Sequence, residues 1–306
     1  RVRPIAKAPI YPKISEINRK LLEKSENFKP DLVFIYRNLY ITPITIKAIQ
    51  KKGALVFSYN NDDPFSLRYR KLDRFLWRVY LQSIKVCDYN FVFRHKNIRD
   101  FAKLGLKNVN ILRGFYVKKR CFRRLELKKH SDLVFVGHYE DDGRDKYIKS
   151  FIDQKINFKL YGTSWQNSDY YQEIVEYLAY DPARHLYADE YNKVLNESKI
   201  AIVFLSKLNN DTYTTRCFEI PAIGTMMLCE RTEDMQSLFT EGKEAVYFSS
   251  ISECIDKLTY YLEQDRYIFI ADNGFKRIHS DGHEAIDRCR EILLTYDSLI
   301  KLSRTA

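Results

Sequence analysis

Glycine and proline are scarce in this sequence, with 10 and 8 among 306 residues. This scarcity excludes collagen-like and low-complexity chains. Long apolar runs are also missing, since runs such as residues 133–136 and 201–205 fall far short of the roughly 20 residues that a membrane-spanning helix needs. No apolar segment of a signal peptide stands at the N-terminus. The sequence therefore predicts a globular cytoplasmic protein.

Several motifs that carry chemistry are absent as well. No two of the six cysteines stand as C-x-x-C, so zinc and redox sites lose their main signal, and free thiols are expected. The chain has no phosphate loop, no G-x-G-x-x-G, no H-E-x-x-H and no G-x-S-x-G. A D-x-D motif, which holds a divalent metal through oxygen ligands in one group of nucleotide-sugar enzymes, is also missing. We therefore expect no bound metal and no cofactor.

Charge is distributed unevenly along the chain. Residues 1–130 contain 31 Lys and Arg against 10 Asp and Glu, a balance of +21, whereas residues 131–306 contain 20 against 30, a balance of -10. The densest basic run is 118–129, with seven basic residues among twelve. A positive field concentrates phosphates, anionic lipids or nucleic acid at its surface, although a basic run is often only a solvated linker. The two halves are therefore expected to face different partners.

Apolar segments alternate with helical spacing through the whole chain. The apolar segments before the basic run are residues 31–36, 54–58, 89–93 and 109–112. Those after it are residues 132–136, 157–161, 200–205, 226–229 and 245–248. Continuous apolar strands separated by helices predict parallel sheets that are covered on both faces.

The alternation restarts after the basic run and predicts two Rossmann-like domains. We expect the first in residues 1–125, the second in 126–285, and a C-terminal helix over 286–306 that packs back toward the first. No glycine precedes Gly53, so the usual opening strand, glycine loop and helix of the first domain is expected to be missing.

The most specific segment, residues 206–224, follows the apolar strand 200–205 as a loop and a short helix. Thr214 or Thr215 can cap this helix, and its free amides favour a phosphate because the helix dipole also attracts an anion. Glu219 lies one turn into the helix, where its carboxylate can accept two hydrogen bonds from the diol of a ribose. An ordinary capped helix with a surface glutamate is the simpler interpretation of these residues alone.

Residues 205–248 resemble the donor-binding segment of glycosyltransferases of the spore-maturation-protein (CgeB-like) group, which are similar to the group 1 enzymes of the GT-B fold. The shared pattern is R-x-F-E-x-x-A-x-G, a strand, E-R-T-E-D and F-x-x-G-K-E-A-V-x-F. The chain departs from the group 1 pattern in one place, because Asp211 precedes Glu219 where group 1 enzymes have a glutamate. This resemblance implies a GT-B fold, with the two domains facing a cleft.

The resemblance implies transfer of a sugar from a nucleoside-diphosphate sugar to an acceptor hydroxyl without a metal. Helix amides and cations must then meet the charge of the leaving group. The expected donor-binding residues are Arg144, Trp165, Tyr187, Lys207, Thr214, Thr215, Arg216 and Glu219. Asp211 is expected near the donor sugar. Arg144 can instead pair with a neighbouring aspartate, and the two aromatic residues can simply pack.

The first domain should hold the acceptor and any general base. Candidates at the predicted strand ends are Asp63 and His95, because a carboxylate or an imidazole can take the proton of the acceptor hydroxyl. The segment 60–64 also has the composition of an ordinary turn.

A nucleotide donor needs only a few local groups, so it does not explain the +21 of the first half. We therefore expect an anionic or lipid-linked glycan as acceptor, surface-glycan or glycoconjugate synthesis as the role, and an anionic inner membrane face as a possible contact of the basic half. Two alternatives stay open: a nucleotide-sugar epimerase on the same fold, and a non-catalytic module that binds nucleic acid. No RNA-binding motif or zinc finger supports the latter, so no nucleic-acid partner is expected.

Overall fold

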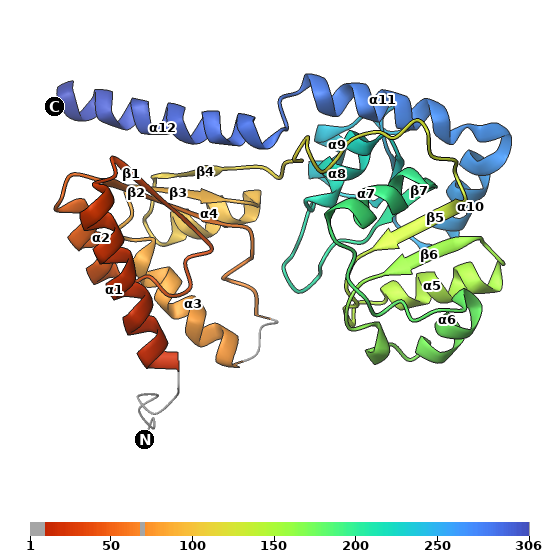
Figure 1. The fold of residues 1–306 in the computed structure, drawn as a ribbon, viewed down its shortest axis with the longest axis horizontal. Coiled ribbons are helices and arrows are strands. Elements are labelled where there is room, and N and C mark those ends of the chain that lie inside the picture. The colour runs from red at the N-terminus through yellow and green to blue at the C-terminus, as the bar shows by residue number, and fades with distance from the viewer. Residues whose placement is uncertain (1–9, 68–70, 306) are drawn as a thin grey trace. The chain divides into compact units, whose positions relative to one another are not determined.

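The apolar segments of the sequence become the strands of two parallel sheets. In the computed structural model, which describes residues 10–67 and 71–305, the chain divides into a first unit of residues 1–113 and 290–306 and a second unit of residues 114–289. Residues 114–125, which the sequence assigned to the first domain, lie in the second unit. Figure 1 shows the order of the elements within each unit.

The first unit contains a four-stranded sheet with the order β1-β2-β3-β4. Its strands are β1 (Leu32–Tyr36), β2 (Leu55–Asn60), β3 (Tyr89–Val92) and β4 (Val109–Ile111). Its helices are α1 (Ile10–Phe28), α2 (Pro43–Gln50), α3 (Lys71–Ser83) and α4 (His95–Lys103). The sequence predicts a helix over residues 69–84, and residues 69–70 of that range lie outside the described residues. All three strand pairs are parallel.

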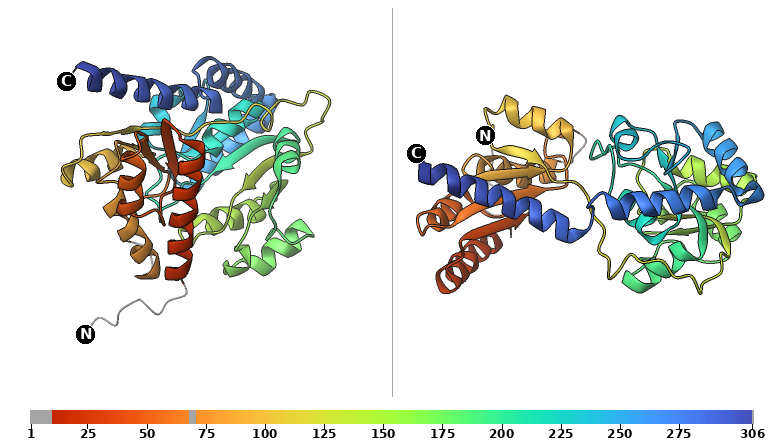
Figure 2. Two further views of the ribbon diagram at one scale, coloured as in Figure 1. Left: turned by 60° about the vertical axis from the view of Figure 1, so that its left-hand side comes forward. Right: turned by 90° about the horizontal axis from the view of Figure 1, so that it is seen from above.

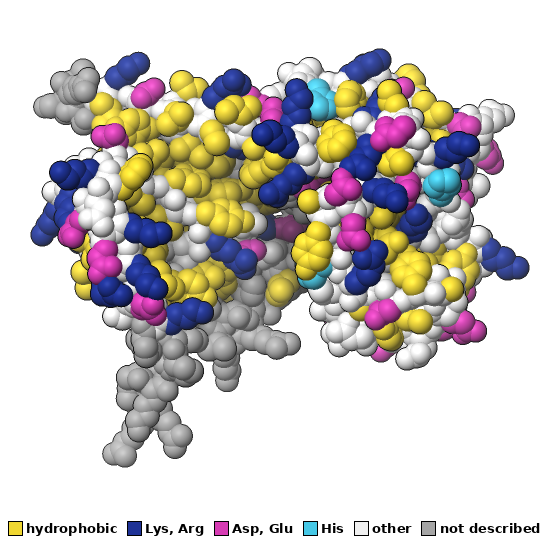
Figure 3. Space-filling view, in the orientation of Figure 1, with side chains coloured by type: hydrophobic (Ala, Val, Ile, Leu, Met, Phe, Trp, Pro, Cys, Tyr) yellow, Lys and Arg dark blue, Asp and Glu magenta, His cyan; other side chains and the backbone are white. Residues whose placement is uncertain are grey.

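The two faces of this first sheet differ in composition. Ile35 and Val56 face α1 and α2 and form a small aliphatic core with them. The opposite face is aromatic, because the register places Phe34 beside Phe57 and Tyr59 beside Phe91. Figures 1 and 2 show α12 (Ala285–Thr305) passing over this aromatic face. Figure 3 shows further apolar side chains gathered on the surface of this unit.

The second unit contains a five-stranded parallel sheet with the order β6-β5-β7-β8-β9. Its strands are β5 (Ser131–Val136), β6 (Phe158–Tyr161), β7 (Ser198–Val203), β8 (Met226–Glu230) and β9 (Val246–Phe248). The helices before β8 are α5 (Arg144–Asp153), η2 (Trp165–Asn167), α6 (Tyr171–Leu178), α7 (Ala188–Asn196) and α8 (Arg216–Ile223). Those after it are α9 (Glu233–Leu238), α10 (Ile251–Leu262), η3 (Glu263–Asp265) and α11 (Tyr267–Ser280). The predicted α/β fold with two parallel sheets is confirmed.

Local sequence explains where several helices begin. Thr42 precedes α2, and its hydroxyl accepts the amide of Thr45 at 3.4 Å, with Pro43 at the first helical position. Ser250 caps α10 in the same way by accepting the amide of Glu253 at 3.1 Å. Within the described residues, no helix has both the length and the apolar content that crossing a bilayer requires.

Candidate functional site

A cavity of about 260 Å³ lies at the carboxyl ends of β5 and β6, beside the start of α8. This edge is where ligands bind in open α/β sheets. The cavity is lined by Val136, Gly137, His138, Gly162, Thr163, His185, Leu186, Tyr191, Arg216 and Glu219. Arg216 and Glu219 are therefore the two predicted donor-binding residues whose side chains the fold brings to one cavity.

Two glycine-containing loops come into close contact on one side of this cavity. Gly162 has a φ of 149°, and a Cβ atom there would lie 2.0 Å from the carbonyl oxygen of Gly137, so any side chain would push the loops apart. The amide of Tyr139 donates to the carbonyl of Thr163 at 2.9 Å and ties the two loops together. On this side of the cavity, the close approach places Gly137 and Gly162 in the lining, next to His138 and Thr163.

Trp165 holds the same loops from inside the core. Its indole nitrogen donates to the carbonyl of Gly137 at 2.9 Å, and its ring is fully buried against Phe135. We predicted that Trp165 frames the base of the nucleotide, but its ring is buried and does not line the cavity. Its function is packing, because a hydrophobic ring at the end of β6 is covered by the loop that follows β5.

The start of α8 offers unpaired donors to the cavity. Thr214 and Thr215 precede Arg216, and the amides of Thr215 and Arg216 donate to no other residue among those described. The guanidinium of Arg216 lies 5.8 Å from the ring centroid of Phe135, and its buried Nε atom has no hydrogen-bond partner in the described part of the chain. Unpaired amides, a helix dipole and an unsatisfied guanidinium nitrogen together favour an anion.

Glu219 lies one turn further along α8 and meets a tyrosine from α7. The hydroxyl of Tyr191 donates to Oε2 of Glu219 at 2.8 Å. Burial raises the pKa of Glu219, while the Tyr191 hydrogen bond and the charges of Arg216 and Arg120 act against that increase. One carboxylate oxygen is thus held by Tyr191, and Oε1 can accept a hydroxyl of a ligand in the cavity.

Arg144 does not line the cavity, although we predicted it as a second cation for the donor. Its side chain is buried, and its Nε and Nη2 atoms donate to the two carboxylate oxygens of Asp142 at 2.8 and 2.7 Å. Its Nη1 atom donates to the carbonyl of His138 at 2.7 Å. These bonds fix the loop between β5 and α5, and they occupy the guanidinium nitrogens of Arg144.

Glu140 in the same loop is held by several donors. It contacts Nε2 of His138 at 2.8 Å, and the hydroxyl of Ser206 donates to it at 2.8 Å. Burial alone would raise the pKa of Glu140, but the His138 hydrogen bond, the Arg144 charge and the Ser206 hydrogen bond lower it to about 2. This carboxylate links the loop after β5 to the loop after β7.

Three further predicted residues lie outside the cavity lining. Lys207 is paired with Glu230 at 2.8 Å. Tyr187 is 73% exposed, and its ring lies 6.1 Å from that of His185. Asp211 is partly buried in the loop before α8, where its amide donates to the carbonyl of Ser206. The structure thus does not place the charge of Lys207 or the ring of Tyr187 in the cavity.

In the first unit, Asp63 and His95 both follow strands at the carboxyl edge of the sheet. Asp63 is fully buried, accepts the side-chain amide of Asn97 at 2.9 Å and pairs with Lys96 at 3.0 Å. A buried carboxylate that pairs with an ammonium group is less available as a general base, so this environment does not favour the predicted role of Asp63. His95 is exposed, and its Nε2 atom lies 3.4 Å from Nη2 of Arg113.

Sequence reasoning missed Tyr191, Gly162 and Thr163 as lining residues. Gly162 had a recognisable signal, because a glycine directly after an apolar strand often marks a close backbone approach. Tyr191 had none, since it lies 28 positions before Glu219 and reads as one more aromatic residue of a helix.

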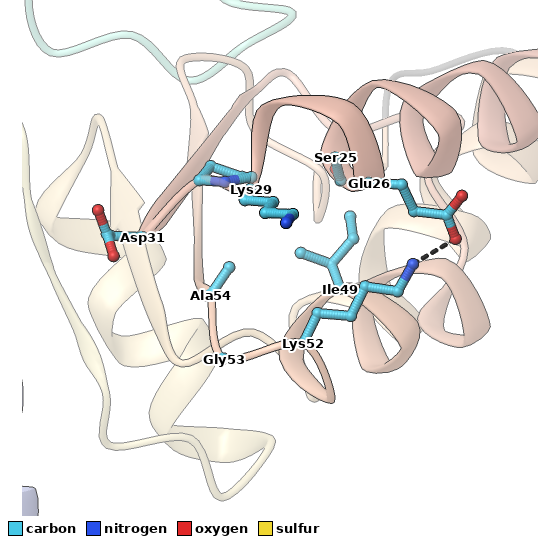
Figure 4. Close-up of a pocket in the computed structure, with 9 residues that line it drawn as sticks. Ser25, Glu26, Lys29, Asp31, Ile49, Lys52, Gly53 and Ala54 are labelled. Carbon is cyan, nitrogen blue, oxygen red and sulfur yellow. Dashed lines mark hydrogen bonds and ion pairs between the residues drawn. The ribbon is translucent and has the colours of Figure 1, made fainter.

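Other features of the molecule do not favour a competing site. A cavity of about 480 Å³ in the first unit lies at the amino ends of β1 and β2, the edge opposite to ligand sites in such sheets, and Glu26 pairs there with Lys52 (Figure 4). Within residues 10–67 and 71–305, no three His, Cys, Asp or Glu side chains gather in a way that could hold a metal ion.

Comparison with known proteins identifies a family for part of the chain. Residues 144–294 match a protein family described as "Glycosyl transferase-like". This range includes most of the residues that line the cavity. No curated protein sequence matches the chain.

Solved structures share the fold over nearly the whole chain at low identity. Sucrose-phosphate synthase from Thermosynechococcus elongatus is 11% identical with a TM-score of 0.70, over 97% of this chain and 80% of that one. HepE from Anabaena, solved with UDP and glucose, is 11% identical with a TM-score of 0.66, over 94% of this chain and 82% of that one. A protein from Listeria monocytogenes named as a UDP-N-acetylglucosamine 2-epimerase is 9% identical with a TM-score of 0.60, over 98% and 82%. The fold is that of the GT-B glycosyltransferases.

Proposed function

We propose that this protein is a glycosyltransferase that binds a nucleoside-diphosphate sugar in the cavity of the second unit and transfers the sugar to an acceptor hydroxyl. The observation that supports this proposal best is the arrangement at α8. An unpaired guanidinium nitrogen of Arg216 and free helix amides lie one helical turn from Glu219. These groups match a diphosphate followed by a ribose.

In this proposal, Arg216 and the amides of Thr215 and Arg216 stabilise the negative charge that develops on the leaving nucleoside diphosphate. Their positive potential supplies locally what a divalent cation supplies in other nucleotide-sugar enzymes, so we propose that transfer is independent of metal. Initial rates in EDTA should equal those in magnesium or manganese. A rate that disappears in EDTA and returns with metal would contradict this part.

Glu219 binds the ribose hydroxyls in this proposal, and Tyr191 orients it. Glu219→Ala should weaken binding of UDP by about 1.5 to 3 kcal/mol, because a hydrogen bond to a charged group is lost. Isothermal titration calorimetry measures the dissociation constant directly. Glu263→Ala, at an exposed carboxylate paired with Arg266, is the matched control and should leave it unchanged.

UDP and UDP-sugars are the first probes because the similar HepE structure contains UDP and glucose. Thermal-shift screening against uridine, guanosine, adenosine and thymidine diphosphates then identifies the base. A structure named as an epimerase shares the fold, so product analysis must separate the two reactions. The appearance of sugar on an added acceptor supports transfer. A nucleotide sugar whose configuration is inverted at one carbon, formed without an acceptor, supports epimerisation.

The proposed acceptor is an anionic or lipid-linked glycan of surface polysaccharide synthesis, reached from the inner membrane face. The basic character of residues 1–130 supports this choice. We also propose membership of the spore-maturation group, on the pattern over 205–248. His95 and Asp211 are our candidates for the acceptor side and the donor sugar respectively. His95→Ala should lower kcat while leaving the dissociation constant for UDP unchanged.

A further inference from the structure

A groove of about 250 Å³ lies in the second unit, away from the nucleotide cavity. One wall is the basic segment 123–129, and the other is the start of α11. Figure 1 shows the connection from β4 to β5, which contains this segment, passing alongside α11. Gly224 at the end of α8 and Asn196 at the end of α7 also line the groove. It therefore lies at the amino edge of the second sheet, opposite the edge where the nucleotide cavity lies.

Three cations line this groove, and they are only partly compensated. Arg123 pairs with Asp272 at 2.8 Å, and Arg124 pairs with Asp189. Lys129 is partly buried, and its ammonium group donates to the carbonyl of Ser198 at 2.9 Å.

No carboxylate among the described residues pairs with Lys129. Burial and the nearby Arg123 charge lower its pKa to about 8, as expected for an ammonium group that lacks a counter-ion. A buried charge without a partner is costly, so an anion in the groove would stabilise it.

The rim of the groove is apolar and unusually exposed. Leu125 is 85% exposed and Ile268 is 48% exposed, and both line the groove from opposite walls. Phe269, next to Ile268, is 59% exposed. Lys128, in the same basic segment, is also exposed. Apolar side chains next to cations match the boundary between phospholipid headgroups and acyl chains.

We propose that this groove binds the phosphate-bearing headgroup of an anionic phospholipid, with Leu125 and Ile268 entering the acyl boundary. Arg124 and Lys129 then face the phosphate, and Arg123 remains with Asp272. The inference deepens the membrane association in the proposed function by assigning it to named residues, and it does not depend on the chemistry of the donor site.

The test is cosedimentation with two kinds of vesicle, one of phosphatidylcholine alone and one that also contains about 30% phosphatidylglycerol. The negative surface potential of the second kind attracts basic segments. Wild-type protein should bind the anionic vesicles and not the neutral ones. Lys129→Gln should weaken this binding by about 3- to 10-fold, and the double variant Leu125→Ser, Ile268→Ser by a similar factor. UDP binding is measured in parallel and should be unchanged in both variants, so failure here is distinguishable from failure of the glycosyltransferase proposal.

Matched controls distinguish binding at this groove from non-specific electrostatic and hydrophobic binding elsewhere on the surface. Lys103→Gln and Ile44→Ser change an exposed cation and an exposed apolar side chain of the first unit, and both should bind vesicles like the wild type. Lys129→Gln should also be at least as resistant to heat as the wild type, because the removal of a partly buried charge that has no carboxylate partner among the described residues offsets the lost hydrogen bond to Ser198. Equal vesicle binding by all variants would overturn the proposal. The proposal would also be overturned if inorganic phosphate competes with the vesicles while the double apolar variant binds them like the wild type. That result would indicate a site for free anions.

Discussion

The carboxyl edges of the two sheets are built from similar residues but leave different groups available. At the edge of the first sheet, polar side chains bind each other, since Asp63 holds Lys96 and Asn97, and Arg37 pairs with Asp62 at 2.6 Å. At the edge of the second sheet, Arg216 keeps an unpaired nitrogen beside a cavity. Among the described residues, buried polar atoms without a hydrogen-bond partner also occur at the first edge, at Nδ2 of Asn38 and Oδ1 of Asn61. What distinguishes Arg216 is that its unpaired atom belongs to a cation that lines a cavity.

The largest effect is expected at the contact between Gly162 and Gly137, where two loops meet at the carboxyl edge of the second sheet. Gly162→Ala should destabilise the protein by about 3 kcal/mol or more, because the new methyl group would overlap the carbonyl of Gly137. Gly105→Ala in the first unit also has a positive φ, of 77°, but no atom within 4 Å, so it should cost only about 1 to 2 kcal/mol. Urea unfolding at neutral pH measures both. Equal losses would show that the loop contact is not special.

The next prediction compares two arginines. Arg216→Gln should weaken UDP binding by about 1.5 to 3 kcal/mol, since a charge-assisted hydrogen bond is lost. Arg37→Gln, in the first unit, should leave UDP binding unchanged because its guanidinium is paired with Asp62. Calorimetric titration with UDP gives both constants. A loss of UDP affinity in the Arg37 variant alone would indicate that the nucleotide binds in the first unit.

A third prediction concerns acid stability. The pKa of Glu140 is lowered to about 2, so its contribution to stability is complete above its usual value of 4.5 and is lost as the pH falls toward 2. Glu140→Gln should therefore cost on the order of 2 kcal/mol at pH 7, and the difference from wild type should shrink between pH 5 and pH 2. Urea unfolding across this range measures it.

The control for this third prediction is Glu23→Gln in the first unit. Glu23 forms an exposed ion pair with Arg19, and the substitution should change stability by less than about 1 kcal/mol. A Glu140 variant with the same pH dependence as the wild type would mean that this carboxylate does not hold the loops together.

The smallest expected effect sharpens the description of Glu219. Tyr191→Phe removes one hydrogen bond and should weaken UDP binding by about 0.5 to 1.5 kcal/mol. A positioning role further predicts that 2′-deoxy-UDP loses less affinity than UDP, because both depend on the diphosphate but only UDP presents the full diol. Equal losses for the two nucleotides would indicate a general packing effect.

The sequence by itself determined the order of strands and helices, and it pointed to the segment where we propose that a nucleotide binds. Apolar strands alternate with amphipathic helices, and this period identifies parallel sheets without any knowledge of long-range contacts. Arg216 and Glu219 could be predicted because the pattern over 205–248 resembles a donor-binding segment. Their spacing of three residues on one short helix then brings both to the same edge.

Only the tertiary structure decided which other polar and aromatic residues serve the site. Arg144, Lys207 and Asp63 each have a charged partner, and Trp165 is covered by a neighbouring loop. Whether a charge is paired or a ring is buried depends on which segments meet in space. The contact of Tyr191 with Glu219, from another helix, is of the same kind. A single sequence shows which groups each residue carries, but packing determines whether a given group is paired with a neighbour or available to a ligand.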